Sequence, residues 1–305
     1  MTYRDAWEEG KNALLAAGIA EAELDARLLL EAVCGTDRNT LLVRGDRELT
    51  AEEEAGYRGL TARRTQRIPL QYLTGEQDFM GLPFRVDERV LIPRQDTEIL
   101  VEEALQFLHD GMRVLDVCTG SGCILISLLR YTNDCTGVGV DVSEGALQVA
   151  GMNAERLLGE GALQGRAAPA EEAQEGRRIC FVQSNLFDAV EGKFDVIVSN
   201  PPYIPSDVIG TLMPEVKDHE PREALDGGRD GLFFYREIVK ESRAHLVGGG
   251  MLFFEIGCDQ GQAVRGLLEE AGFLGIQVKK DYGGLDRVVY GTLGFPAPAR
   301  EDVPG

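Results

Sequence analysis

The residues with the clearest chemical meaning are Asn200-Pro201-Pro202-Tyr203, which directly follow the apolar run 194–199. Asn200 precedes a proline, so its backbone is held extended, and its side-chain oxygen is a hydrogen-bond acceptor. The Pro201 carbonyl is a second acceptor, and consecutive prolines hold both acceptors rigid. Two fixed acceptors match the two hydrogens of an –NH2 group, and Tyr203 can stack on the planar group that bears it. The motif therefore predicts chemistry at an amide or amine nitrogen, whereas a proline pair alone would only end a strand.

A glycine turn is the second candidate site. It follows the apolar run Val114–Val117 and precedes a helical pattern, so backbone N–H groups can approach a ligand at a helix N-terminus. A dinucleotide fingerprint requires a third glycine three positions after Gly122, but Leu125 stands there, which disfavours a pyrophosphate-bearing cofactor. The residues of the turn are Cys118, Thr119, Gly120, Ser121 and Gly122.

Asp141 ends the next apolar run, roughly 20 residues beyond the turn, where a carboxylate commonly accepts hydrogen bonds from ribose hydroxyls. An isolated aspartate at such a place is more often a helix cap. Combined with a turn that lacks the third glycine, however, Asp141 favours binding of an adenosine that bears no phosphate. S-adenosylmethionine is such a ligand.

These residues need a scaffold that brings strand ends together. From residue 112 onward, short apolar runs alternate with helical stretches, which is typical of a parallel α/β sheet buried on both faces. In such sheets, ligands bind beyond the carboxyl ends of the strands, so the proline corner and the glycine turn are expected to face each other. The seven runs are Val114–Val117, Val138–Val142, Ile179–Val182, Val196–Val198, Met251–Ile256, Ile276–Val278 and Val288–Tyr290.

The first seventy residues have a helical pattern. Leu14, Leu15 and Ile19 are spaced for one helical face, and a second set from Leu24 to Val33 continues the period until Gly35. Thr50 is expected to cap a helix that runs to Arg67 and is ended by Pro69. The cluster Arg58, Arg63, Arg64 and Arg67 is interpreted as a solvated helix face, with docking to a partner as the less favoured alternative.

Residues 71–95 are predicted to form short strands or a connecting hairpin. Asp96 or Thr97 is expected to cap the following helix. The stretch 159–178 lacks an apolar period and is interpreted as a mobile surface loop, and the tail 295–305 is expected to fray.

Composition narrows the choice of partners. The chain has 305 residues and a formal net charge of −20, which argues against a surface built to bind a phosphate backbone. Six cysteines without a Cys-x-x-Cys pair, and only three histidines, favour a reducing compartment and disfavour a metal site. Neither a signal peptide nor a membrane span is evident, so a cytoplasmic protein is expected.

Several longer stretches resemble the HemK-type (PrmC) release-factor glutamine methyltransferases over nearly the full chain. The proline corner alone is shared with adenine-amine methyltransferases, whereas the flanking stretches are more specific. The matching stretches are 69–75, Leu91-Ile92-Pro93-Arg94-Gln95-Asp96-Thr97-Glu98, 200–204, Glu220-Pro221-Arg222-Glu223-Ala224-Leu225 and 281–287.

The resemblance implies a class I (Rossmann-like) S-adenosylmethionine-dependent methyltransferase with a seven-stranded α/β sheet. It implies an N-terminal helical domain for substrate recognition (1–70), a connecting β-hairpin (71–95), a catalytic domain (96–294) and a tail (295–305). The implied reaction is methylation of the side-chain amide nitrogen (N5) of the glutamine in the Gly-Gly-Gln motif of class 1 peptide chain release factors. The expected protein acts as a monomer, with no membrane and no nucleic-acid substrate.

Carried over residue by residue, Cys118 to Gly122 would hold the methionine part of the cofactor and Asp141 its ribose. Asn185 and Leu186 would flank the adenine, although many relatives have an acidic and an aromatic residue there. The corner Asn200 to Tyr203 would hold the glutamine. Cys118 occupies a position often filled by glycine, which predicts a backbone conformation that allows a side chain.

Three alternatives differ in substrate or class. A ribosomal-protein glutamine methyltransferase would use the same corner. An adenine-amine methyltransferase for DNA or RNA should carry a basic recognition region, but residues 1–70 have a net charge of −3 and the remainder is acidic. A cofactor-binding module without activity is disfavoured by the intact Asn-Pro-Pro-Tyr motif.

Overall fold

The computed structural model describes residues 1–163 and 178–295. Its contacts divide the chain into two compact units. The first unit contains residues 1–77, 86–88 and 211–220, and the second contains 78–85, 89–210 and the residues from 221 onward. Most of the predicted loop 159–178, and the tail beyond Phe295, lie outside the described residues.

The first unit is helical, as predicted. The predicted stop at Gly35 is confirmed, because this residue takes a φ of 57° directly after the second helix. The cap at Thr50 is also confirmed, and it forms a reciprocal capping box with Glu53. The helices are α1 (Tyr3–Ala16), α2 (Ala22–Cys34), α3 (Arg38–Val43), α4 (Ala51–Thr65), α5 (Leu70–Thr74) and α9 (Pro214–Lys217).

Three details of this unit differ from the sequence expectation. α4 ends at Thr65, and Pro69 precedes α5 instead of ending α4, because a residue without an N–H group suits a helix start. Leu15 and Leu24 are 53% and 40% exposed, so they lie outside the apolar face that contains Leu14.

The arginine cluster is only partly a solvated face. Arg64 is buried, and its Nε donates to Oδ2 of buried Asp25 at 2.7 Å. Glu215, from the distant segment 211–220, accepts from Arg64 Nη1 at 3.1 Å and lies 3.2 Å from Arg67 Nε. The side chain of Arg58 is 54% exposed. The interpretation was wrong for Arg64. Burying an unpaired guanidinium is costly, but the two carboxylate partners of Arg64 allow it to be buried.

The predicted hairpin is present as β1 (Glu76–Phe79) and β2 (Leu82–Arg85). Met80 and Gly81 connect the strands with φ values of 51° and 70°, as a tight two-residue turn requires. The next helix does not begin as predicted. A 3-10 turn, η1 (Gln95–Thr97), leads into α6 (Glu98–Leu105), and neither Asp96 nor Thr97 caps it through its side chain.

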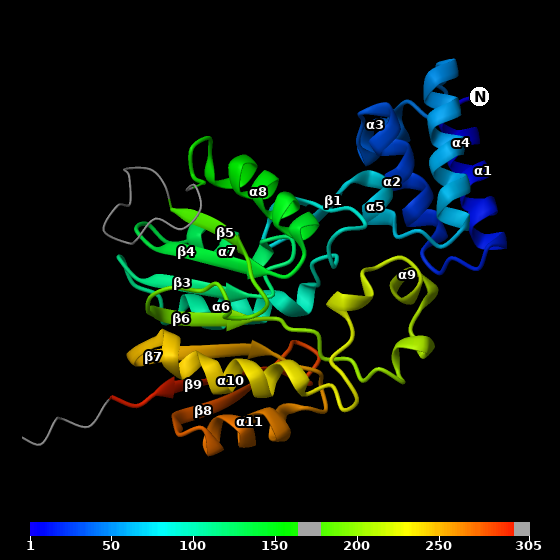
Figure 1. The fold of residues 1–305 in the computed structure, drawn as a ribbon. Helices are drawn as coiled ribbons and strands as arrows, with labels where there is room; N and C mark the ends of the chain where they lie inside the picture. Colours follow the sequence, from blue (N-terminus) through cyan, green and yellow to red (C-terminus); the bar gives the residue numbers. More distant parts are fainter. Residues whose placement is uncertain (164–177, 296–305) are drawn as a thin grey trace, which may run out of the picture. The chain divides into compact units, whose positions relative to one another are not determined.

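All seven apolar runs form strands of one sheet within the described residues (Figure 1). The strand order is β5-β4-β3-β6-β7-β9-β8. The expectation of a parallel sheet holds for the first five strands, but β9 is antiparallel to both of its neighbours. The strands are β3 (Arg113–Val117), β4 (Thr136–Asp141), β5 (Ile179–Gln183), β6 (Phe194–Ser199), β7 (Leu246–Glu255), β8 (Phe273–Lys280) and β9 (Asp286–Leu293).

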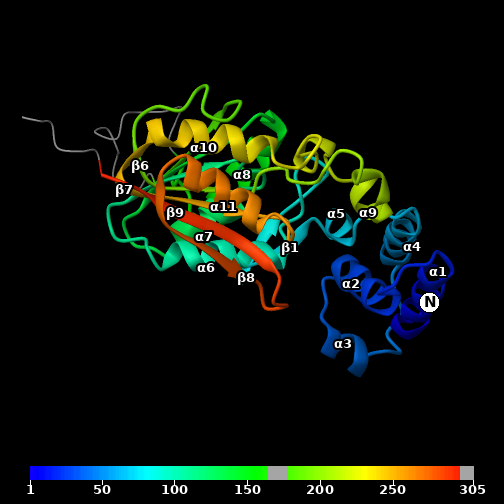
Figure 2. The same cartoon turned by 90° about the horizontal axis from the view of Figure 1, so that it is seen from below.

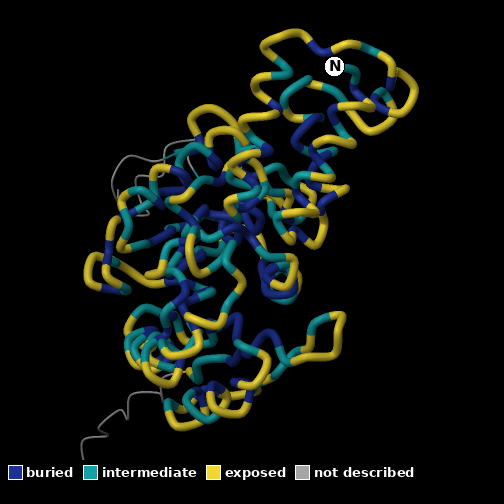
Figure 3. Tube along the Cα trace, turned by 90° about the vertical axis from the view of Figure 1, so that its right-hand side faces the viewer, coloured by how far each residue is buried: buried dark blue, intermediate teal, exposed yellow. Residues whose placement is uncertain are grey.

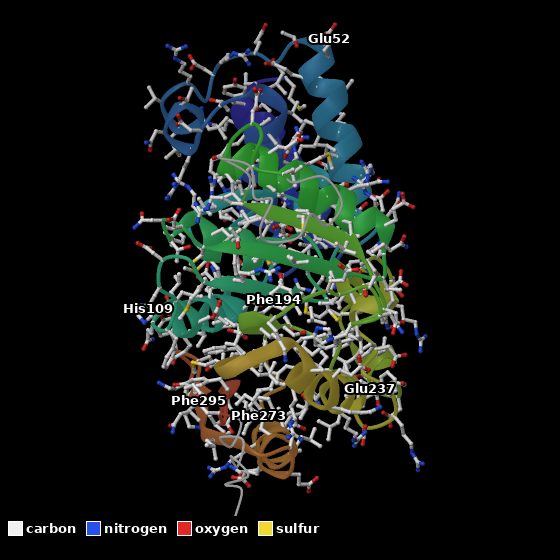
Figure 4. All side chains as sticks on the ribbon, turned by 60° about the vertical axis from the view of Figure 1, so that its left-hand side comes forward. Glu52, His109, Phe194, Glu237, Phe273 and Phe295 are labelled. Atoms are coloured by element: carbon white, nitrogen blue, oxygen red, sulfur yellow. The ribbon has the colours of Figure 1, made fainter. Side chains whose placement is uncertain are left out.

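Helices cover both faces of the sheet, which explains why the inner strands are largely apolar (Figures 1 and 2). The edge strand β8 is the exception, because most of its residues are exposed or half-buried. Alternate strand residues pack into two separate cores, with Val114 in one and Leu115 in the other. The first core lies under α6, α7 (Cys123–Arg130) and α8 (Glu144–Leu158), and the second lies under α10 (Phe233–His245) and α11 (Gly261–Glu270). Buried positions, which are dark blue in Figure 3, include the strand residues Val114, Leu115 and Ile197. Phe194, labelled in Figure 4, begins the central strand β6 and is 1% exposed.

Candidate active site

A pocket of about 970 Å³, measured to its open mouth, lies at the carboxyl ends of β3, β4 and β6, entirely within the second unit. The pocket brings together most of the residues singled out from the sequence. They are Cys118, Thr119, Gly120, Ser121, Asp141, Asn185, Leu186, Asn200 and Pro202.

Gly122, Pro201 and Tyr203 do not line this pocket. Gly122 takes a φ of 79°, and a Cβ added there would lie 2.8 Å from Ile126 Cδ1. A glycine is therefore needed here for the conformation and the close packing of the turn. Pro201 is buried directly after Asn200. The Tyr203 backbone carbonyl accepts from Gln260 Nε2 at 3.0 Å, and burial raises the pKa of the Tyr203 phenol.

The glycine turn has an unusual backbone at its first residue. Cys118 takes a φ of 62°, in the left-handed region that favours glycine, which corrects the expectation of a conformation suited to a side chain. The thiol hydrogen-bonds with Ser199, whose hydroxyl also donates to the Val117 carbonyl at 2.6 Å. These contacts between the ends of β3 and β6 hold the strained residue in place.

Asn153 on α8 fixes the other end of the turn. This fully buried residue donates from Nδ2 to the Ser121 carbonyl at 2.9 Å and to the Arg85 carbonyl at 3.1 Å. Its Oδ1 accepts from Arg85 N at 2.7 Å, so all three bonds are satisfied by backbone groups. This role could not be predicted from the sequence, since an asparagine in a helix has no motif of its own.

Asp141 lies at the end of β4 with both carboxylate oxygens held by backbone N–H groups. Oδ2 accepts from Gly120 at 2.9 Å, and Oδ1 accepts from Ser143 at 2.9 Å. Ser143, not Asp141, caps α8, because its hydroxyl accepts from Ala146 N. Each carboxylate oxygen retains a lone pair for a ligand hydroxyl. Burial raises the pKa of Asp141, while the backbone donors lower it and the nearby Glu223 carboxylate raises it.

Asn185 and Leu186 lie on the pocket wall after β5. Leu186 takes a φ of 50°, and its carbonyl accepts from the Ser184 hydroxyl at 2.9 Å. The same hydroxyl oxygen accepts from Ala189 N at 2.9 Å, so Ser184 organises the loop. Asn185 Nδ2 donates to Asp188 Oδ2 at 3.3 Å.

Asn200 has a defined orientation. Its Nδ2 donates to Thr97 Oγ1 at 3.4 Å, so its Oδ1 is directed away from that hydroxyl. Asn200 also lines the pocket. The amide oxygen is therefore available as an acceptor for a ligand.

Further residues that line the pocket were not assigned to the site from the sequence: Arg89, Pro93, Arg94, Thr97, Glu223 and Phe234. Pro93, Arg94, Thr97 and Glu223 fall in stretches that carry the family resemblance, which was the available signal. Two buried carboxyls near this site were also missed. Burial raises the pKa of Asp116 and of Glu255 to about 7 each.

In residues 1–163 and 178–295, no group of three or more His, Cys, Asp or Glu side chains is arranged to hold a metal ion. In the same part of the chain, no helix is long and apolar enough to cross a bilayer.

A seven-stranded sheet with one antiparallel strand, and a pocket above a glycine turn with an acidic residue ending the next strand, define the class I methyltransferase fold. A solved structure of a methyltransferase from Pyrococcus furiosus has the same fold. It matches with a TM-score of 0.52 and 19% identity, covering 77% of this chain and 100% of that one.

Sequence comparison defines the family more narrowly. Residues 5–75 match the PrmC N-terminal domain, and residues 95–212 match the methyltransferase small domain. The release factor glutamine methyltransferase of Geobacter sulfurreducens is 42% identical over 96% of this chain and 97% of its own length. The corresponding protein of Caulobacter vibrioides is 40% identical over 96% of each chain. The chain belongs to the release factor glutamine methyltransferase family, and it is an enzyme of the methyltransferase class.

Proposed function

We propose that this enzyme transfers a methyl group from S-adenosylmethionine to the side-chain amide nitrogen of the glutamine in the Gly-Gly-Gln motif of class 1 peptide chain release factors. The observation that carries the proposal is the Asn200 side chain, which lines the pocket with its amide nitrogen donating to Thr97. Its oxygen is thereby presented as an acceptor for an N–H group. The names of the curated relatives supply glutamine and release factor as the substrate class.

The residues of the pocket fit S-adenosylmethionine. The turn from Cys118 to Gly122 would hold its methionine part, and the two remaining lone pairs of Asp141 would accept from the ribose hydroxyls. Asn185 and Leu186 would flank the adenine, and Asn200 would lie between cofactor and substrate. When bound, the cofactor supplies an electrophilic methyl group on a positively charged sulfur.

The contribution of the chain is orientation and local electrostatics. Asn200 Oδ1 and the Pro201 carbonyl would each accept one N–H of the glutamine amide, and Tyr203 would pack against the amide plane. An amide nitrogen is a poor nucleophile because its lone pair is delocalised, so holding it in line with the methyl group lowers the barrier. The glutamine nitrogen would gain the methyl group as its bond to sulfur breaks, so that S-adenosylhomocysteine is the product, and the nitrogen would lose one proton to solvent.

The domain boundaries expected from the sequence belong to this proposal. Residues 1–70 would recognise the release factor, 71–95 would connect, 96–294 would catalyse, and 295–305 would form a tail. The matches at residues 5–75 and 95–212 support a division near the hairpin. Monomeric action and a cytoplasmic location stay predictions.

The test is methylation with labelled S-adenosylmethionine, offered in parallel to a purified class 1 release factor, a ribosomal-protein substrate and nucleic acid. We expect label on the release factor alone, at the glutamine of its Gly-Gly-Gln motif. Label only on the ribosomal protein would establish the sister activity, and label only on nucleic acid would overturn the proposal.

A variant series assigns the reaction to the corner. Asn200→Ala is expected to slow transfer at least 100-fold while the cofactor dissociation constant changes by less than about threefold, since the lost acceptor faces the substrate. Asn133→Ala is the matched control, because Asn133 is exposed and lies outside the pocket. Equal rates for Asn200→Ala and the parent would refute the assigned role.

A further inference from the structure

Thr97 occupies an unusual place for a helix-start threonine. It precedes α6 but makes no capping hydrogen bond, it is 2% exposed, and it lines the pocket. Its Oγ1 accepts the hydrogen bond from Asn200 Nδ2 at 3.4 Å. A hydroxyl has one proton to donate, so its second partner determines where that proton goes.

The second partner of Thr97 is the carboxylate of Glu255, which accepts from the threonine side chain. Glu255 ends β7 and is 1% exposed, and its Oε2 has no hydrogen-bond partner among the described residues. The Arg287 guanidinium contributes a nearby positive charge, and Arg287 is itself paired with Asp96 and Asp281 at 3.1 Å each. The Glu255 carboxylate is therefore buried with little beyond Thr97 to satisfy it.

These contacts form a directed chain from Asn200 through Thr97 to Glu255. If the Asn200 amide turned over, its oxygen would require the Thr97 proton, and Glu255 would lose its donor. Leaving a buried carboxylate oxygen without a donor is costly, so an ionised Glu255 disfavours the flipped amide. The observed orientation presents Oδ1 to the substrate.

We propose that Thr97 and Glu255 are positioning residues that fix the orientation of the Asn200 amide, so that its oxygen, and not its nitrogen, faces the substrate N–H group. This proposal rests on the proposed function, because it assigns the acceptor for the glutamine amide. A flipped Asn200 would direct an N–H toward the substrate N–H and repel it.

The charge state of Glu255 links this network to pH. The charged groups that act most directly on Glu255 are Arg287 and Arg94, which favour its ionised form, and Asp96, which opposes it. Tyr203, Tyr235 and Cys123 also lie within its electrostatic reach. Because burial raises the pKa of Glu255 to about 7, the carboxylate holds the Thr97 proton most firmly above that pH. Protonation allows Glu255 to donate to Thr97, which frees the threonine proton for a flipped amide.

The experiment measures single-turnover methylation of a purified release factor, with cofactor affinity from calorimetry and thermal unfolding for each variant. Thr97→Val keeps the shape but removes the hydroxyl, and we expect about a tenfold slower methyl transfer with the cofactor dissociation constant within about twofold. Thr97→Ser keeps the hydroxyl and should restore most of the rate. Thr132→Val is the matched control, since the Thr132 hydroxyl donates only to the Leu128 carbonyl and lies outside the pocket.

Glu255→Gln provides a second line of evidence. A glutamine amide can donate to Thr97, so both orientations of Asn200 become accessible, and we expect about a threefold slower transfer. The rise in parental rate with pH near 7 should flatten in this variant. Because both residues act through one hydroxyl, Thr97→Val/Glu255→Gln should be no slower than Thr97→Val alone.

Several outcomes would overturn the proposal. Thr97→Val as fast as the parent would do so, as would equal losses in Thr97→Val and Thr97→Ser, which would indicate packing alone. Multiplicative losses in the double variant would indicate independent roles and also refute it. A parent that leaves the release factor unlabelled would instead refute the proposed function, and the same variants would then be measured on whichever acceptor takes the label.

Discussion

Replacing Asp141 with alanine tests the cofactor site most directly. The carboxylate holds Gly120 N and Ser143 N at 2.9 Å each, and it retains one lone pair on each oxygen for a ribose hydroxyl. Hydrogen bonds to a charged group contribute about 1.5–3 kcal/mol each, so loss of two would cost at least about 3 kcal/mol of binding free energy. At about 1.4 kcal/mol per tenfold, the cofactor dissociation constant should rise by roughly 100-fold or more.

The assay is calorimetric titration with S-adenosylmethionine. Asp195→Ala is a matched control, because Asp195 is also half-buried on a strand and its Oδ2 accepts from Arg113 N at 2.8 Å, yet it lies outside the pocket. The control should bind the cofactor like the parent. If Asp141→Ala and Asp195→Ala changed the dissociation constant by the same small factor, below about threefold, the ribose assignment would be refuted.

Three further predictions concern the stability of the fold. Burial raises the pKa of Asp116 to about 7, so the unfolded chain loses this proton at lower pH than the folded protein, and the free energy of unfolding falls as pH rises. Asp116→Asn should remove about 2 kcal/mol of the fall between about pH 5.5 and 8, measured by urea titration at several pH values. The same fall in the variant and the parent would contradict this. Arg64→Met leaves buried Asp25 unpaired and should lower the free energy of unfolding by about 3 kcal/mol. The double variant Arg64→Met/Asp25→Leu should regain most of that free energy, with unfolding of both variants monitored by circular dichroism. Gly122→Ala places a Cβ 2.8 Å from Ile126 at a φ of 79°, and should cost about 1–2 kcal/mol in the same urea assay; a neutral substitution would show that the turn adapts.

The inner strands were predictable because the sheet is covered on both faces, which leaves these strands largely apolar. The direction of the last strand was not predictable from periodicity. β8 ends at Lys280 and β9 begins at Asp286, and a connection this short cannot contain the crossover that parallel strands need. Connection length, not apolar pattern, was the signal for the antiparallel strand.

The candidate site was predictable where chemistry follows local spacing. The glycine turn and Asn200 each follow an apolar run, Asp141 lies near the end of another, and the fold places all three at one pocket. Thr97 and Glu255 could not be found in this way, because 158 positions separate them in the sequence and only the folded sheet joins them. Arg64 is comparable, since nothing in a run of arginines indicates which one faces Asp25.

The segment 211–220 has a consequence for how the protein matures during synthesis. It belongs to the first unit, where Glu215 pairs with Arg64 and Arg67, and where the His219 ring lies 3.2 Å from the Gln66 carbonyl. Arg64 and Glu215 are separated by 151 positions, so at roughly 5–20 residues per second the ribosome needs on the order of ten seconds or more to supply the missing partner. By then β3, β4, β5 and β6 have already been translated. The N-terminal helices therefore reach their final set of ion pairs only after the centre of the catalytic sheet exists, and a fragment ending at the hairpin would lack part of its own unit.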